Sequence, residues 1–593
     1  MTGRAGRGFL WAAALLAFAG PLAAQVDTTA RDTTARKDTT KAAHDTLPAY
    51  LPVFAEPTPA GPLPCGTRYS FTADSFAFSS VQTLSDLLGR IPGVYVVRGG
   101  IYGQAEIVLY GGRGAAGLEI YWDGVPYLPI GRDSVFLDAA RISLAPLERV
   151  DVIVLPATLR VYLVSRRQQS TATTSLVGVA TGEAGTANYR GAFLRRWHSG
   201  LGLSLVADYN ATDGIGNSSS SPFSSVDLWL NAQYLPSPKF GVSYQILSSS
   251  WHRSASDIGT TADFRYQRRD GMLRMFAARR DDGLGPRVEL TVATARASHD
   301  TTVSDRSLSQ VVLGLADRWP RGQAGLTFRT ADAARPWQIE GQAGWTRWPG
   351  LTLAGDVRHA AYSGGRSGNR VHLAAGLVLP RGFSLHGDFA WARDLQAPVD
   401  PTDTAQRTVD LSGAVRWDWS RVTLELGGAS RDPYAPTGWA AGIRSLSGLG
   451  PSQHTRYVTV HGAVELLPGL HLAGWYFDPL VQTGQDFEPP LHARFSLTFY
   501  SKFWRVYTSG LFALRGELAM ESWSRGTAGL DSAGAPAMLP GASFGEINIE
   551  LRIAGVTIYW IQRNATLFRG SYVPGLNYPR RYQFYGVRWW FTN

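Results

Sequence analysis

The sequence predicts an all-β transmembrane barrel of about 22 antiparallel strands, with an N-terminal α+β domain inside its lumen as a plug. Three observations support this fold class. From residue 173 to residue 593, strand-length segments alternate apolar and polar residues between Gly-, Pro-, Asp- and Ser-rich turns. Aromatic residues gather near the ends of these segments. Residues 65–172 instead combine a short helix with a few strands, as a compact plug domain would.

The N-terminus predicts export. Arg4 and Arg7 precede an apolar run over residues 9–19, and Leu22-Ala23-Ala24 suits signal-peptidase cleavage. We therefore expect residues 1–24 to be a signal peptide. After this segment, no apolar run approaches the roughly 18 consecutive residues that a membrane helix requires, so a spanning role would have to be built from strands.

Residues 25–64 form a Pro/Thr-rich tether. Asp-Thr-Thr recurs at Asp27, Asp32 and Asp38 and is followed by several prolines. Such a segment buries too little apolar surface to fold, so we expect it to be disordered. Within it, residues 51–55 are apolar and extended enough to add as a strand to the edge of a partner's sheet.

Charge distribution and cysteine content argue against a nucleic-acid partner and against an intramolecular disulfide. The formal net charge is +10, but Arg and Lys are scattered among Asp and Glu rather than gathered in a stripe. We assign the charge to a solvated lumen and to loops, and predict no nucleic-acid partner. Cys65 is the single cysteine, so an intramolecular disulfide is impossible.

The plug region begins with a short amphipathic helix. Ser80 is an expected cap, and Gly89 and Pro92 end the helix. Strands are expected over residues 94–97 and 105–110. The apolar face of the helix carries four residues at helical spacing: Leu84, Leu87, Leu88 and Ile91.

The predicted barrel strands have one apolar and one polar face. In residues 546–553 the apolar face carries Ile547, Ile549, Leu551 and Ile553, and the opposite face carries Glu546, Asn548, Glu550 and Arg552. The last strand, over residues 582–591, places Tyr585, Val587, Trp589 and Phe591 on one face. We assign the aromatic groups at residues 475–477 and 589–591 to interfacial girdles. Short turns are expected at residues 236–238, 379–382 and 467–469.

No enzyme signature is present. Residues 112–117 match G-x-G-x-x-G, but a strand pattern follows where a dinucleotide site needs a helix. The 11 histidines are dispersed, and H-E-x-x-H and G-x-S-x-G motifs are absent. We therefore predict no catalytic residues, no cofactor and no metal site.

Four short motifs follow one another over about seventy residues. They are Asp86-Leu87-Leu88 through Pro92-Gly93-Val94, then Gly112-Arg113-Gly114, then Asp123-Gly124-Val125, then Glu148-Arg149-Val150-Asp151-Val152. In this order they resemble the plug domain of the TonB-dependent outer-membrane receptors. The resemblance implies structural roles for Pro92, Gly93, Gly112, Arg113, Gly114, Asp123, Gly124, Glu148 and Arg149. Asp-Gly suits a tight turn, and the Glu-Arg pair is either a contact to the barrel wall or an ordinary pair of strand-edge charges.

The resemblance also implies a location and a function. We expect an outer-membrane receptor of a Gram-negative-type bacterium that imports a scarce solute, such as an iron chelate, a cobalamin-like compound, a glycan or a peptide. Implied partners are the TonB periplasmic domain, outer-membrane lipid and lipopolysaccharide, the barrel-assembly machinery and the extracellular ligand. Leu51, Val53 and Phe54 form the candidate coupling segment of the periplasmic tether.

Two departures keep a second interpretation open. After the last motif the chain has Leu155-Pro156-Ala157 where these receptors usually have Gly-Pro, and a clear coupling box is not visible near the mature N-terminus. The alternative is a plugged barrel without energy coupling, acting as a passive pore or a structural surface protein. The sequence does not identify substrate-binding residues.

Overall fold

The computed structural model describes residues 51–54, 68–79, 81–98, 106–130, 137–213, 222–254, 263–299, 306–347, 350–435, 454–480, 491–503, 506, 509, 511–530, 536–566, 571–573, 576–577 and 581–592. The predicted signal peptide and most of the predicted tether lie outside these residues. Among the described residues, no helix has the length and apolarity needed to cross a membrane.

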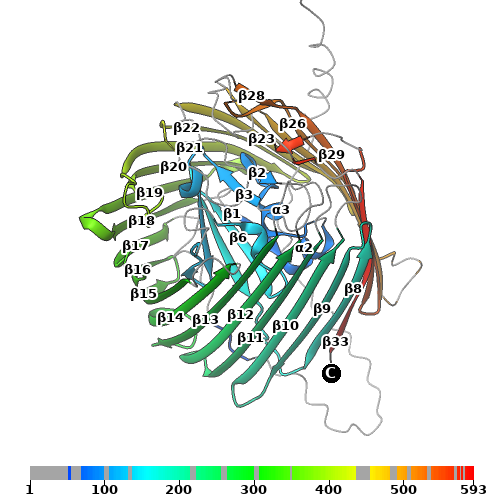
Figure 1. Cartoon of the computed structure of the whole chain (residues 1–593), viewed down its shortest axis with the longest axis horizontal. Coiled ribbons are helices and arrows are strands. Elements are labelled where there is room, and N and C mark those ends of the chain that lie inside the picture. The colour runs from blue at the N-terminus through cyan, green and yellow to red at the C-terminus, as the bar shows by residue number, and fades with distance from the viewer. Residues whose placement is uncertain are drawn as a thin grey trace, which may run out of the picture.

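Twenty-two antiparallel strands form one closed barrel, which confirms the predicted fold class (Figure 1). Each strand pairs with the next along the chain, and the last strand pairs with the first from Phe584↔Gly182 to Thr592↔Thr174. The strands are β8 (Thr174–Gly182), β9 (Ala187–Arg196), β10 (Leu201–Thr212), β11 (Phe223–Ser237), β12 (Phe240–Arg253), β13 (Phe264–Ala278), β14 (Gly285–His299), β15 (Arg306–Trp319), β16 (Gly322–Thr330), β17 (Trp337–Thr346), β18 (Leu351–Ala361), β19 (Ser367–Val378), β20 (Phe383–Asp394), β21 (Gln406–Trp419), β22 (Val422–Arg431), β23 (Thr455–Leu467), β24 (Leu470–Pro479), β25 (His492–Ser501), β26 (Phe512–Trp523), β29 (Ala542–Ile553), β30 (Val556–Arg563) and β33 (Tyr582–Thr592).

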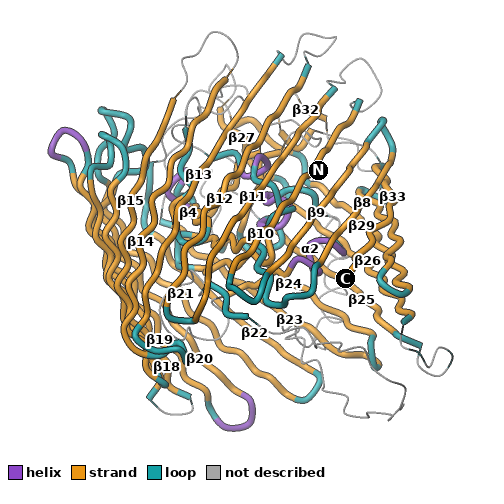
Figure 2. The backbone as a smooth tube through the Cα atoms, turned by 90° about the horizontal axis from the view of Figure 1, so that it is seen from below, coloured by secondary structure: helices purple, strands orange, loops and turns teal. Residues whose placement is uncertain are grey.

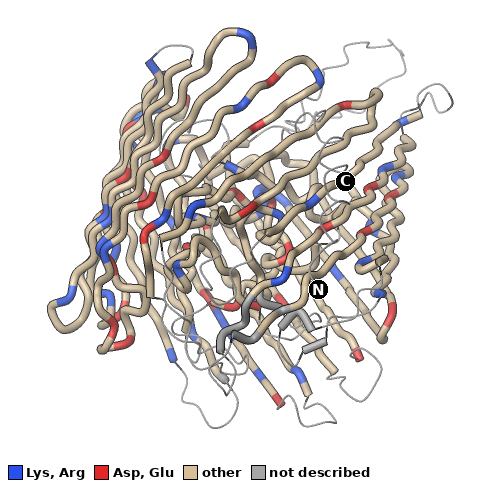
Figure 3. Tube along the Cα trace, turned by 90° about the horizontal axis from the view of Figure 1, so that it is seen from above, with Lys and Arg blue, Asp and Glu red and all other residues tan. Residues whose placement is uncertain are grey.

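The strand faces follow the predicted alternation. In β29, Ile549 and Ile553 are exposed on the outer wall while Asn548 and Glu550 are buried inside. Lys, Arg, Asp and Glu are interspersed along the barrel rather than separated by sign (Figure 3). Period-two alternation places apolar side chains against lipid and charged ones in the lumen.

One aromatic group does not lie where it was expected. Trp475 and Phe477 of β24 are buried inside the barrel rather than exposed in a girdle at the outer wall. Their positions in the strand give them the parity of lumen-facing residues. By contrast, Tyr585, Val587 and Trp589 of β33 are exposed on the outer wall, as predicted.

The two rims of the barrel differ in the length of their connections. At one rim, β11–β12, β19–β20 and β23–β24 are joined by the short turns that the sequence predicted, the second of these being η6 (Pro380–Gly382). We call this the turn rim (Figure 2). At the opposite rim, the loop rim, longer connections include the hairpins β27 (Gly526–Leu530) with β28 (Pro536–Leu539) and β31 (Ser571–Val573) with β32 (Leu576–Asn577), and the short η5 (Ser363–Gly365).

A smaller domain fills part of the lumen (Figure 1). Its five-stranded sheet has the order β1 (Arg68–Thr72), β6 (Leu147–Val154), β7 (Leu159–Ser165), β4 (Leu118–Trp122) and β5 (Val125–Pro126). A separate pair comprises β2 (Val94–Arg98) and β3 (Glu106–Tyr110). Its helices are α2 (Ala73–Phe78), α3 (Leu84–Leu88), η2 (Gly114–Gly117) and η4 (Ala139–Arg141). We call this domain the plug.

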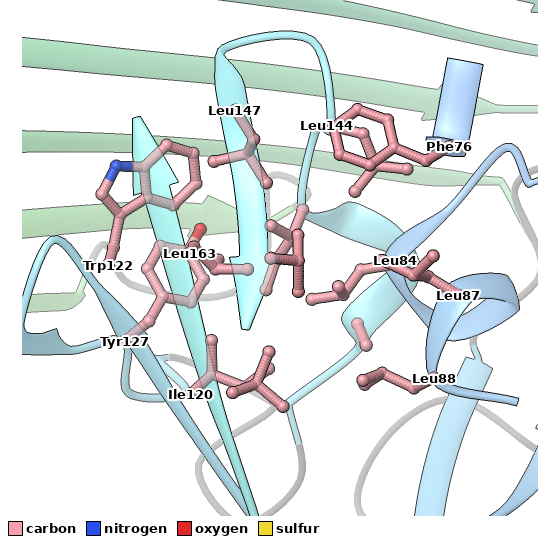
Figure 4. Close-up of a cluster of buried hydrophobic side chains, with 14 of the residues drawn as sticks. Phe76, Leu84, Leu87, Leu88, Ile120, Trp122, Tyr127, Leu144, Leu147 and Leu163 are labelled. Carbon is pink, nitrogen blue, oxygen red and sulfur yellow. The ribbon is translucent and has the colours of Figure 1, made fainter. Parts of the chain in front are cut away.

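The amphipathic helix of the plug is shorter than predicted. α3 begins after Thr83, whose hydroxyl accepts from the backbone N–H of Asp86, while the Asp86 carboxylate accepts from the N–H of Thr83. This capping box fixes the helix start, so the prediction of Ser80 as the cap is wrong. Gly89 ends the helix as expected. The apolar residues of α3 pack against the sheet in the core shown in Figure 4.

The plug core continues into the barrel wall. The same apolar cluster that contains the α3 leucines also contains lumen-facing residues of the wall: Leu176, Ala192, Leu194, Val206, Trp229, Leu247, Met272, Ala293 and Val312. The plug is therefore seated by hydrophobic packing against β8–β15, and polar contacts hold it against other strands of the wall.

Candidate functional site

The Pro92-Gly93 motif forms the turn between α3 and β2. Gly93 has φ +77°, and a Cβ at this position would lie 2.7 Å from Cε2 of the Phe477 ring. Only glycine allows this backbone conformation so close to the ring. The motif therefore brings a plug turn against the barrel wall at β24.

The Gly112-Arg113-Gly114 motif couples the plug to the loop rim. Both glycines have positive φ and turn the chain from β3 into η2. Arg113 forms a buried ion pair with Asp410 of β21 and donates from Nη1 to the Asp432 carbonyl at 2.8 Å. Its guanidinium carbon also lies 4.9 Å from the ring centroid of Tyr434. The strand β4 follows η2, as the sequence predicted, where a dinucleotide site would need a helix.

The Asp123-Gly124 motif is the tight turn between β4 and β5. The φ angles are +45° at Asp123 and +88° at Gly124. The Asp123 carboxylate accepts from the Ser165 N–H at 3.0 Å and from Gln245 Nε2 at 3.0 Å. Because Gln245 lies on β12, this turn also contacts the barrel wall.

The Glu148-Arg149 motif forms ion pairs inside the plug. Arg167 Nη2 lies 2.5 Å from Glu148 Oε1, and Arg149 Nε lies 2.9 Å from Asp151 Oδ2. Arg68 Nη2 also lies 2.8 Å from Asp151 Oδ2. These pairs lie within the plug, as the alternative of strand-edge charges expects.

A network of one glutamate and three arginines joins the plug to the barrel, and no sequence motif indicated it. Glu119 of β4 faces three arginines, with Arg160 Nε at 3.1 Å and Arg358 Nη2 at 2.8 Å, and Arg370 in direct contact. Arg160 belongs to β7 of the plug, whereas Arg358 and Arg370 belong to β18 and β19. The two barrel arginines also pair with Asp394 of β20. Alternation in β18 and β19 marks these arginines as lumen-facing, but not their partner.

The arginines determine the charge state of Glu119. Burial by itself would raise the pKa of this carboxyl, but Arg358, Arg370 and Arg160 outweigh burial and hold the pKa well below its usual value. Glu119 is therefore ionised at neutral pH, and the network holds the plug against β18 and β19.

The candidate coupling segment is seated at the turn rim. Phe54 is buried with Leu235 and Phe276, and its ring meets Phe276 edge to face at 5.1 Å. The Leu51 N–H donates to the Gln169 carbonyl at 2.7 Å. Arg196 Nη1 donates to the Pro52 carbonyl at 2.5 Å. The segment is thus held by one aromatic side chain and by backbone hydrogen bonds; Val53 is half-buried.

A cavity of about 130 Å³ lies between the plug and parts of β8–β12, β30 and β33. It extends from Thr212 and Tyr582, near the loop rim, to Leu176, near the other end of β8. Plug residues on one side include Phe76, Thr83, Asp86 and Glu106, and wall residues on the other include Asn188, Arg190, Asp208, Asn210, Asp227, Trp251 and Tyr559. Polar and aromatic side chains that surround a cavity are suited to binding a small solute. Among the described residues, no group of three or more His, Cys, Asp or Glu could hold a metal ion.

Comparison with known proteins identifies the plug. Residues 66–161 match the family model described as TonB-dependent Receptor Plug Domain. No curated protein sequence matches the chain. The domain inside the closed 22-strand barrel is therefore a plug of the TonB-dependent type.

Solved structures with the same plug-and-barrel fold extend over nearly the whole chain. The copper transporter OprC superposes with a TM-score of 0.70 at 13% identity, covering 90% of this chain and 99% of its own. The ferric enterobactin receptor PfeA from Pseudomonas aeruginosa gives 0.69 at 12% identity, covering 89% and 98%. The FrpB iron transporter from Neisseria meningitidis gives 0.68 at 9% identity, covering 89% and 99%. The chain therefore has the fold of the TonB-dependent receptors over its plug and its barrel together.

Proposed function

We propose that this protein is an outer-membrane receptor that captures a scarce extracellular solute and imports it by TonB-coupled rearrangement of the plug. The observation that carries the proposal is a plug domain of the TonB-dependent type inside a closed 22-strand barrel. A barrel of this size has a lumen that would leak without a plug, and the plug must move to admit a bulky solute.

The loop rim is the extracellular face in this proposal, because long loops lie outside the cell and short turns in the periplasm. Leu51, Val53 and Phe54 then lie at the periplasmic rim, where TonB would bind them. Solved structures of this fold are named as a copper transporter, a ferric enterobactin receptor and an iron transporter, which favours a metal or a metal chelate as the solute. Lipopolysaccharide would surround the barrel, and the barrel-assembly machinery would insert it.

The test is binding of the TonB C-terminal domain to the purified protein, with and without residues 26–64. We expect binding that disappears with the deletion. The deletion removes both the candidate coupling segment and the rest of the tether. A full-length chain with Val53→Ala and Phe54→Ala keeps the tether and changes only the segment, so it shows which of the two TonB needs. If neither the full-length protein nor the deletion binds, energised uptake is excluded for this chain.

The cavity between plug and wall favours a second candidate, a passive pore. It provides space between the plug and β8–β12, β30 and β33 without plug movement. Conductance of the purified protein in planar bilayers separates the two functions. Steady ohmic conductance without TonB supports the pore, and a closed barrel supports the energised receptor.

A further inference from the structure

Asp227 is an acidic side chain of this cavity that forms no ion pair within the described part of the chain. Asp227 of β11 lines it and is only 6% exposed. Its Oδ1 accepts no hydrogen bond, and no Lys, Arg or His in the described part of the chain forms a salt bridge with it. A buried carboxylate without a counter-charge is strongly unfavourable, so this position calls for a partner that the protein itself does not supply.

Asp208 and Asp86 of the cavity are paired with arginines, and Glu106 accepts from the hydroxyls of Thr83 and Ser85. Asp208 lies directly opposite Asp227 in the β10–β11 ladder. Arg190 donates to both oxygens of the Asp208 carboxylate, from Nε to Oδ1 at 2.9 Å and from Nη2 to Oδ2 at 3.0 Å. Asp86 forms an ion pair with Arg563, with 2.6 Å between Oδ2 and Nη2. Arg190 is held by both oxygens of Asp208 and makes no ion pair with Asp227. Asp227 is therefore the carboxyl group of this wall that no arginine neutralises, and a bound cation would favour its ionised form.

An aromatic wall lies beside this carboxylate. In the β11–β12 ladder Asp227 opposes Ser249, and Ser225 opposes Trp251, so Asp227 and Trp251 are diagonal neighbours on the lumen face. The Trp251 ring meets Phe223 edge to face at 5.1 Å, and its Nε1 is buried without a hydrogen-bond acceptor. Tryptophan is the best aromatic partner for an organic cation.

We infer that this cavity binds a ligand bearing an organic ammonium group, with the cation between the Asp227 carboxylate and the Trp251 indole. A hard metal ion would need six or more oxygen ligands, whereas the neighbours here are one free carboxylate, hydroxyl and amide groups and an aromatic ring. The inference deepens the proposed receptor function by naming a chemical feature of the solute, and it rests on that function for the route of access from the loop rim.

Calorimetric titration of the purified full-length protein tests the site. The probe is phenethylammonium, and the matched neutral compound is 2-phenylethanol. We expect phenethylammonium to bind at least tenfold more tightly than 2-phenylethanol, and Asp227→Asn to abolish that preference. Asp281→Asn is the control, since it removes the same charge from an exposed position at the turn rim. Trp251→Leu should weaken amine binding severalfold while the barrel stays folded.

Three results would overturn the inference: equal binding of the amine and the alcohol, unchanged amine binding by Asp227→Asn, or an Asp227-dependent site that takes calcium and excludes the amine. Because calorimetry needs no TonB, these results are independent of the receptor function. If the protein binds the amine but not the TonB domain, energised uptake is rejected and the cation site at Asp227 and Trp251 is supported.

Discussion

Arg160 of the plug and Asp356 of the barrel form a two-pronged ion pair, with Nη1–Oδ1 at 2.9 Å and Nη2–Oδ2 at 2.8 Å. The two residues are 196 positions apart in the chain. His372 contacts the same carboxylate through Nδ1 at 3.2 Å and reaches Asp388 through Nε2 at 3.1 Å. Paired, planar hydrogen bonds of this kind fix orientation as well as distance, so this contact sets how the plug faces β18–β20.

Glu119→Gln should weaken the seating of the plug. The variant leaves three buried guanidinium groups without one of their carboxylates, a change that costs about 3 kcal/mol when a buried pair is broken. Asp394 and Asp356 still pair with Arg370 and Arg160, so part of the positive charge remains neutralised. Denaturant unfolding followed by a plug-specific probe measures the loss. Equal stability of variant and wild type would contradict a role in seating.

The stabilisation by Glu119 should depend on pH. Its pKa is lowered in the folded protein, so its contribution is complete above the unfolded pKa of about 4.3 and is lost as the pH falls through the folded value. The stability difference between wild type and Glu119→Gln should therefore be largest near neutral pH and shrink in acid. A difference that grows in acid would require the opposite pKa shift.

Gly93→Ala should destabilise the plug by about 1–2 kcal/mol or more, because a side chain in the left-handed region is strained and the new Cβ would collide with the Phe477 ring. Gly191→Ala in β9 is the matched control, since a Cβ there meets nothing within 4 Å. Thermal unfolding of the two variants should show a lowered plug transition for the first only.

Leu235→Ala should release residues 51–54 from the barrel wall while leaving the sequence of that segment unchanged. Leu235 is 1% exposed and packs against Phe54, so its truncation costs about 2–5 kcal/mol of packing at the turn rim. Hydrogen exchange should become faster over residues 51–54, and TonB-domain association should become faster if release limits it. Leu228→Ala, on the exposed outer wall, should change neither.

Arg113→Gln should loosen the loop that follows β22. Arg113 contacts Asp410, the Asp432 carbonyl and the Tyr434 ring, so its loss removes the link between plug and loop. Hydrogen exchange over residues 432–435 should increase. Arg280→Gln, which breaks an exposed arginine–aspartate pair at the turn rim, should leave that loop unchanged.

Sequence alone determined the architecture, for a local physical reason. Lipid outside and water inside impose an alternation that each strand carries by itself, so the exposed Ile549 and the buried Glu550 were predicted without knowing any neighbouring strand. The turns at Gly93 and Asp123-Gly124 are local too, because a positive φ depends on residue type. The same local patterns predicted the plug, the barrel and the last strand, β33.

Tertiary structure alone decided which charges meet. Glu119 joins arginines more than two hundred residues away, and Asp227 is left without a cation because Arg190 is taken by Asp208. These outcomes depend on the register of a closed barrel and on the rotation of the plug inside it. No local pattern encodes either, since a shift of two residues keeps the same faces but exchanges every partner. The sequence specified that Trp475 alternates with its neighbours, and only the closed barrel showed that it faces the lumen.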